Sequence, residues 1–135
     1  TMAVVSGTIV DCFGVTTPMG PLRDGNATPL EIKDLYFTAT FAGTYVQGDN
    51  AQILLANTVI ASHITNGRTW TILDCALAQP GLEAGVVIGA KTIAVSGTTI
   101  TMELTGADLT TEHAGAVLGT MTRPICFFVS VQLSG

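Results

Sequence analysis

Three features of the amino-acid sequence predict a mainly β protein: an antiparallel β-sandwich, jelly-roll-like, with one α-helix near residues 50–65. Threonine, which is β-branched and fits the pleated surface of a strand, occurs 21 times among 135 residues. Apolar and polar residues alternate along several segments, which is the period of a strand with one buried face. Gly and Pro separate these segments, as they do at turns. The length corresponds to one domain, residues 1–135.

The first third of the chain is expected to hold two strands joined by a long loop. Met2–Cys12 mixes Val and Ile around Ser6-Gly7, the pattern of a strand with a bulge. Phe13–Pro29 contains three prolines and three glycines. It predicts a loop or arm at 13–29 that reaches another subunit. In Leu30–Tyr45 every second residue from 35 to 41 is apolar, which predicts a long half-buried strand.

One helix is expected in the middle of the chain. Gly48-Asp49-Asn50 offers an N-cap for Ala51–Ile64, where apolar residues recur at helical spacing. Asn66-Gly67 can end this helix, because glycine readily takes the left-handed conformation. Arg68–Leu77 then alternates as a strand does, and Gln79–Gly85 is a loop rich in Pro and Gly.

The last third of the chain contains the clearest local signal. Lys91–Val95 and Thr98–Leu104 alternate on either side of Ser96-Gly97, which predicts a tight β-hairpin with threonines facing outward. Asp108 is expected to cap a short turn through Leu109–His113. The chain is expected to end in a strand over 123–133 with one apolar face.

Charge is scarce in this sequence, and its scarcity bears on function. Five Lys+Arg and ten Asp+Glu make up 11% of the chain, where about 25% is usual, and the net charge is −5. Two lysines and a negative balance predict no direct contact with nucleic acid or anionic lipid, and no apolar run is long enough for a membrane span. Because interface cores are depleted of charge, a Thr/Ala/Gly surface indicates coverage by partner subunits. The alternative is a threonine-rich surface that stays solvated.

One segment has part of the pattern of a phosphate-binding loop. Gly85–Thr92 ends in Gly89-Ala90-Lys91-Thr92, whereas such a loop needs Gly-Lys-Thr without interruption at the start of a helix. Here an alanine intervenes and a strand is expected to follow. No phosphate site is therefore predicted.

A second group has the residue types of a metal site. Asp108, Glu112 and His113 lie on one short turn, but they fix no tetrahedral or octahedral set and no fourth ligand is indicated. His63 is expected to meet the last carbonyls of the predicted helix. No metal and no cofactor are predicted.

The three cysteines are odd in number and cannot form a closed set of disulfides within one chain. Cys12, Cys75 and Cys126 each lie in an apolar or threonine-rich run, where a cysteine behaves as a small buried hydrophobe. Any of them could pair with His63 or His113 as nucleophile and base, which sequence distance does not exclude. We interpret them as unpaired thiols of a protein made in a reducing compartment.

The remaining polar and aromatic residues give no catalytic pattern. Asp11, Asp74 and Glu103 are interpreted as outward or strand-end positions rather than as an acid–base pair. Trp70 is interpreted as core packing rather than as a sugar-binding platform. Ser96 lies at a hairpin tip and not in a Gly-x-Ser-x-Gly turn. No catalytic residue is predicted, and the protein is expected not to be an enzyme.

Three segments within about residues 30–130 share their residue pattern with a known group of structural proteins. They are Gly48–Leu54, Ile88–Gly97 and Leu104–Gly115. Through them the chain resembles the capsid decoration, or cement, proteins of tailed bacteriophages. The resemblance is one of overall residue pattern and includes no catalytic or ligand motif. Phe13–Pro29 and the three cysteines have no counterpart in it.

The resemblance implies a virion structural protein on the capsid exterior, made in the host cytoplasm. Such a protein binds the major capsid protein, often as a homotrimer at local three-fold positions, and clamps the shell against the pressure of packaged DNA. Many small repeated interfaces would supply the stability. Another virion component, such as a tail, fibre-base or host-adhesion module, is the first alternative. A small Cys/His hydrolase is the second.

Overall fold

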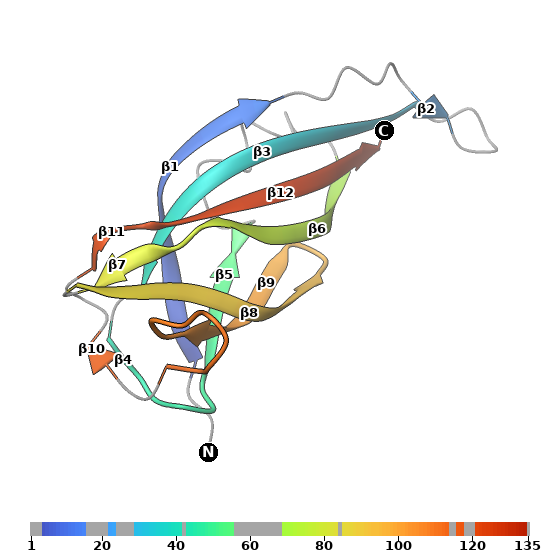
Figure 1. The fold of residues 1–135 in the computed structure, drawn as a ribbon. Helices are drawn as coiled ribbons and strands as arrows, with labels where there is room; N and C mark the ends of the chain where they lie inside the picture. Colours follow the sequence, from blue (N-terminus) through green and yellow to red (C-terminus); the bar gives the residue numbers. More distant parts are fainter. Residues whose placement is uncertain are drawn as a thin grey trace.

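The computed structural model describes residues 4–15, 22–23, 29–41, 43–55, 69–83, 85–113, 116–117 and 121–134. Within these ranges the protein is mainly β, as predicted, and contains no α-helix (Figure 1). The strands in chain order are β1 (Val4–Val15), β2 (Leu22–Arg23), β3 (Pro29–Phe41), β4 (Thr44–Tyr45), β5 (Asn50–Leu54), β6 (Thr69–Gln79), β7 (Gly81–Glu83), β8 (Val86–Ser96), β9 (Thr99–Thr105), β10 (Ala116–Val117), β11 (Met121–Arg123) and β12 (Ile125–Ser134).

Most of these strands belong to one mixed sheet. Its order is β11-β7-β8-β9-β5-β1-β3-β12-β6, and β2 pairs with the start of β3. Neighbouring strands are antiparallel except β1 and β5, which are parallel over Val4–Ser6. β4 and β10 form a separate two-stranded ladder.

The sheet curls so that its two ends approach each other. β6 is at one end of the order, yet the chain passes from it through Pro80 directly into β7 near the other end. The Ile72 N–H of β6 donates to the Gly97 carbonyl at the tip of the β8–β9 hairpin, 2.9 Å away. β6 therefore lies beside β8 across the curl, as Figure 1 shows.

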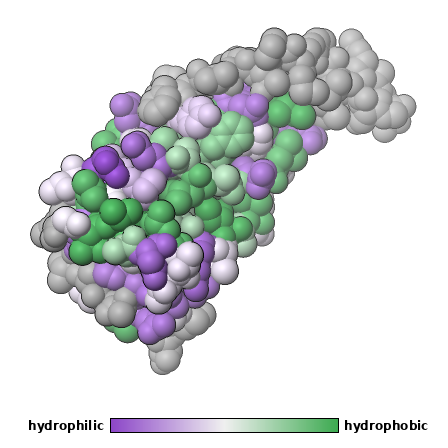
Figure 2. Space-filling view, viewed as in Figure 1, coloured by the Kyte–Doolittle hydropathy of each residue, from purple (hydrophilic) through white to green (hydrophobic). Residues whose placement is uncertain are grey.

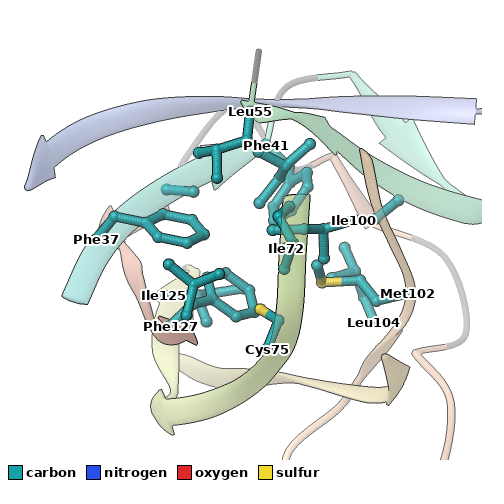
Figure 3. Close-up of a cluster of buried hydrophobic side chains, with 14 of the residues drawn as sticks. Phe37, Phe41, Leu55, Ile72, Cys75, Ile100, Met102, Leu104, Ile125 and Phe127 are labelled. Carbon is teal, nitrogen blue, oxygen red and sulfur yellow. The ribbon is translucent and has the colours of Figure 1, made fainter. Parts of the chain in front are cut away.

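The core fills the inside of this curl. Every second residue of β3 from Leu35 to Phe41 is buried, which confirms the predicted alternation, and the same holds for β12 from Ile125 to Leu133. Phe37 and Phe127 face each other across β3 and β12 and stack, with ring centroids 5.4 Å apart. Side chains from β5, β6 and β9 pack against them (Figure 3), and β1, β4 and β8 each add one fully or nearly fully buried residue.

The helix predicted near residues 50–65 is not seen. Asn50–Leu54, expected as its first turn, is strand β5 between β1 and β9. Ala51, Ile53 and Leu55 are buried with the two-residue period of a strand. The Asp49 carboxylate accepts the N–H of Val46, three residues before it, within a turn that precedes a strand, whereas a helix N-cap accepts an N–H two or three residues after it. Residues 56–65 of the predicted helix lie outside the described residues.

The two-sheet jelly-roll-like sandwich is not confirmed either. The parallel pairing of β1 with β5 joins the two halves of the strand order into one curled sheet, where two antiparallel sheets were expected. The predicted hairpin is present, and strands occupy the described parts of the other segments predicted as strands. Leu30–Tyr45, expected as one strand, is divided into β3 and β4, and Gln79–Gly85, expected as a loop, contains strand β7. The hairpin turn lies one residue later than expected, at Gly97-Thr98, because Ser96 pairs with Thr99.

The segment 13–29, expected as a loop or arm, is partly strand. β1 continues to Val15 because β3 is long enough to pair with it, from Phe13 opposite Tyr36 to Val15 opposite Asp34. Leu22–Arg23 form β2, and β3 begins at Pro29. Residues 16–21 and 24–28 lie outside the described residues.

A substitution can test which face of β12 forms the core. Phe127→Ala removes a fully buried ring and is expected to lower the free energy of unfolding by about 3–5 kcal/mol. Phe128→Ala removes a half-buried ring from the other face and is the matched control. It is expected to lower the free energy of unfolding by clearly less than Phe127→Ala does. Urea unfolding followed by Trp70 fluorescence measures both. Equal losses would contradict the observed alternation.

Candidate functional site

The segments that the sequence singled out for chemistry lie apart in the structure. Gly85–Thr92 forms a turn and the first part of β8, so its backbone amides pair with neighbouring strands. Lys91 lies opposite Glu103 of β9. No helix follows this segment within the described residues, and the phosphate-loop pattern therefore has no structural counterpart.

Asp108 caps a turn in the loop that follows β9, as expected. Its carboxylate accepts the Thr110 and Thr111 N–H groups at 3.0 and 2.8 Å and the Thr111 hydroxyl at 2.7 Å. These hydrogen bonds from Thr111 and Thr110 hold the pKa of the carboxyl below its usual range. They also fix Leu109, whose φ of 62° is left-handed and uncommon for a leucine. The Asp108 side chain thus serves the loop conformation.

The most developed polar group is what we call the Tyr45 cluster: Tyr45, Gly48, Leu104, Glu112 and His113. One carboxylate oxygen of Glu112 accepts the Tyr45 hydroxyl at 2.5 Å and the Gly48 N–H at 2.6 Å. The Tyr45 oxygen in turn accepts the Leu104 N–H at 3.2 Å. The His113 ring stacks on the Tyr45 ring, and the backbone N–H of His113 donates to the backbone carbonyl of Leu104. The cluster ties the loop after β9 to the turn between β4 and β5.

The electrostatics of the Tyr45 cluster favour a neutral phenol and a charged carboxylate. Burial raises the pKa of Tyr45, and the hydrogen bond to Glu112 raises it further. The same hydrogen bond, with that from Gly48, lowers the pKa of Glu112. A phenol with a raised pKa is a poor general base near neutral pH. The arrangement fits a structural hydrogen-bond network better than a catalytic one.

The sequence did not reveal this cluster. Glu112 was considered as a metal ligand, His113 as a metal ligand or as the base of a cysteine nucleophile, and Tyr45 as the end of a strand. The signal that could have indicated it is the tyrosine itself, because a buried hydroxyl nearly always has a hydrogen-bond partner. The partner could not be identified, since it lies 67 residues away along the chain.

No metal site emerges from the described residues. They contain no group of three or more His, Cys, Asp or Glu side chains that could hold a metal ion. Within the same ranges, two buried polar atoms, Thr105 Oγ1 and His113 Nε2, have no hydrogen-bond partner. His63 lies outside the described residues.

The two cysteines whose side chains are described are buried free thiols. Burial, with a smaller contribution from the neighbouring Asp74 charge, raises the pKa of the Cys75 thiol to about 12. Burial also raises the pKa of Cys126. A nucleophilic cysteine needs a lowered pKa, so neither thiol has the environment of a catalytic one. Of Cys12 only the backbone, in β1, is described.

The carboxylates considered as an acid–base pair lie on different strands. Asp11 is in β1, Asp74 in β6 and Glu103 in β9. Asp74 accepts the Cys75 N–H, and Glu103 accepts the Thr92 hydroxyl at 2.8 Å. Trp70 is half-buried and packs against the core.

The surface is the remaining candidate for function. Outward residues of β3 and β12 are mostly neutral, and Tyr36 and Phe128 make an edge-to-face contact there, with centroids 5.3 Å apart. Bulges in β1 and β6 place Val10 and Leu73 outward, 58% and 44% exposed. Figure 2 shows that apolar side chains also reach the surface over β6, β7 and β8. These features can support contact with another protein.

Comparisons with known proteins identify no family for this chain. A scan against protein-family models, a search of curated proteins and a search of solved structures each found no match. Among the residues that the structure describes, none forms a helix of the length and hydropathy needed to cross a membrane.

The hydroxyl of Tyr45 can be tested by Tyr45→Phe. The substitution leaves the buried Leu104 N–H without its acceptor and removes a donor to Glu112, so the free energy of unfolding is expected to fall by about 1–3 kcal/mol. Thr71→Val, which removes an exposed hydroxyl from β6, is the control and is expected to change little. Urea unfolding at pH 7 measures both. A Tyr45→Phe variant with the same free energy of unfolding as the native protein would argue against the network.

Glu112 gives the cluster a pH dependence of known sign. Its pKa is lowered in the folded state, so its contribution is present above the usual glutamate pKa of about 4.3 and is lost as the pH falls through the lowered value. Glu103 and Lys91 are the other charged groups that act on it. Glu112→Gln is expected to destabilise the protein at pH 7 and to differ less from the native protein at pH 3. Urea titrations at pH 7 and pH 3 measure the free energy of unfolding of both proteins. The same difference between them at the two pH values would contradict the prediction.

Proposed function

We propose that this protein is a virion structural protein of a tailed bacteriophage, a capsid decoration or cement protein. It binds the major capsid protein on the outer shell as a homotrimer and stabilises the capsid lattice. The observation that carries the proposal is a β domain with few charges, whose outward strand positions hold mostly threonine, alanine and apolar residues. The residue pattern shared with cement proteins gives the proposal its direction.

The exposed apolar residues support a role in contact with other proteins. Val4, Val10 and Val46 are each more than half exposed, and Leu73 nearly so. Covering apolar surface gains roughly 25 cal/mol per Å², so such residues favour association wherever a partner fits them. Val10 and Leu73 adjoin the exposed Asp11 and Asp74, so a partner would cover the apolar side chains and leave these two carboxylates at the solvated rim.

The mechanism of a cement protein requires no chemistry by any residue. Each bound copy would join neighbouring shell subunits. The shell would be stabilised because the cement protein binds only the assembled shell and not its free subunits. Such a role needs only a stable β domain with contact surfaces, which the curled sheet provides. Because β6 lies beside β8 across the curl, we propose that the fold can be described as sandwich-like. The raised pKa values of Cys75 and Cys126 weigh against the alternative of a Cys/His hydrolase.

Removal of the protein from its virion tests the proposal. Capsids assembled without it are expected to release their DNA at a lower temperature than complete capsids, measured by the fluorescence of a DNA-binding dye during heating. Adding back the purified protein is expected to restore the native temperature. Native mass spectrometry of the free protein is expected to show three times the 13.9 kDa chain mass.

The outcomes separate the proposal from its rivals. Capsids that are equally robust without the protein would contradict the cement role, even if the protein is present in virions. Cryo-microscopy of virions that places it on the tail, the fibre base or an adhesion structure would favour the alternative virion component.

A further inference from the structure

The outward face of four neighbouring strands has a centre without charge. β1, β5, β9 and β8 follow one another in the sheet (Figure 1). The strand register places one outward residue of each strand in a single row: Ser6, Gln52, Thr101 and Ala94. A second row of three lies beside it: Leu54, Thr99 and Ser96. We call these seven residues the Thr101 face.

The Thr101 face is turned away from the core and is accessible. Leu54 is 43% exposed, and the other six residues are exposed or half-buried. The residues that alternate with them along β5 and β9, such as Ile53 and Ile100, are fully buried. Because successive side chains of a strand point to opposite faces, the whole Thr101 face looks outward.

The charged residues nearest to this face stand at its border. Two positions along β9 from Thr101, Glu103 lies opposite Lys91 of β8, so that charges of opposite sign adjoin there. Asp74 is on β6, the strand that lies beside β8 across the curl. A neutral centre with charged residues at the rim is the usual composition of a protein–protein interface.

The outward face of β3, β12 and β6 has the reverse arrangement, with charges in its centre. Asp34, Ser130 and Asp74 form one row across these strands. The Ser130 hydroxyl donates to the Asp34 carboxylate, which keeps that carboxylate on this face. A partner lying flat on this face would cover two carboxylates in one row.

The net charge of the protein makes this difference important for contact between two copies. Five Lys+Arg against ten Asp+Glu give a net charge of −5, so two copies repel each other. Contact through a face with central carboxylates would add the cost of desolvating them. Contact through the Thr101 face adds no ionic cost, because its hydroxyl and amide groups can exchange hydrogen bonds across the contact.

We propose that the Thr101 face packs against a second copy of this chain. Leu54 and Ala94 supply apolar area at the contact, and Gln52 and Thr101 supply neutral donors and acceptors. The inference rests on the homotrimer of the proposed function and names the surface through which its copies meet.

Two glutamine substitutions test this surface by sedimentation velocity over a concentration series at pH 7. Gln52→Glu adds a negative charge to the Thr101 face without changing the side-chain shape. It is expected to raise the concentration needed for association by about tenfold or more, since the charge would be desolvated at the contact. Gln132→Glu makes the same change at a half-buried outward position of β12 and is expected to associate as the native protein does.

Three results with these variants would overturn the proposal. Equal loss of association in both would mean that net charge and not the Thr101 face controls association. Unchanged association of Gln52→Glu would mean that copies meet elsewhere. A Gln52→Glu variant that still associates but no longer binds shells would assign the face to the major capsid protein.

A measurement on the native protein needs no variant to fold. Hydroxyl-radical labelling is compared between a concentration at which the protein is associated and one at which it is dissociated. Leu54 is expected to be labelled less in the associated protein, whereas Phe128, half-buried on the opposite face, is expected to be labelled equally in both. Equal labelling of Leu54, or a native protein that is monomeric at every concentration, would overturn the proposal.

Failure of this inference can be told apart from failure of the cement role. If capsids without the protein release DNA at a lower temperature while Gln52→Glu associates normally, only the assignment of the surface is wrong. If those capsids are as robust as complete ones, the cement role is wrong, whichever surface joins the copies.

Discussion

The pairing of β3 with β12 is the interaction on which the rest of the structure depends. These strands pair from Ala39 opposite Ile125 to Leu30 opposite Ser134, and their inward residues supply much of the core. β1 attaches to the free side of β3 and β6 to the free side of β12. β1 pairs with β5, which continues the sheet through β9 and β8 to β7. The chain also passes from β6 through Pro80 into β7, so the two ends of the sheet meet around the same core. The curl of the sheet follows from this connectivity.

A curled sheet leaves its connecting turns at the surface, and the Tyr45 cluster shows how one group of them is fixed. Tyr45 is fully buried, so its ring contributes to the core while its hydroxyl reaches the Glu112 carboxylate. Through Gly48 and Leu104 the same two residues also satisfy backbone groups of the turn and of β9. One tyrosine and one glutamate thus hold two distant segments with few charges.

The sequence predicted those features that local patterns determine. The alternation from Leu35 to Phe41, the β8–β9 hairpin and the Asp108 cap each depend on residues a few positions apart. The helix prediction failed because Gly48-Asp49-Asn50 has the residue types of an N-cap, while the Asp49 carboxylate accepts the N–H of the preceding Val46 in the turn before β5. What decides between a helix and a strand is the burial of Ala51 and Ile53 between β1 and β9, which is a long-range effect. The Tyr45 cluster could not be predicted for the same reason.

The few carboxylates of this protein have a common use. Asp49, Asp74, Asp108 and Glu112 each accept a backbone N–H, in a turn, at a sheet edge, in a loop and between two segments. A charged acceptor makes a stronger hydrogen bond than a neutral one, so a chain with little charge gains most by placing it where regular pairing ends. The outward strand faces hold mostly threonine, alanine and apolar residues, with single charges such as Asp34 and Glu103 among them. The low charge content is therefore consistent with a β protein in which several acids secure turns and strand ends while largely neutral faces remain available for contact.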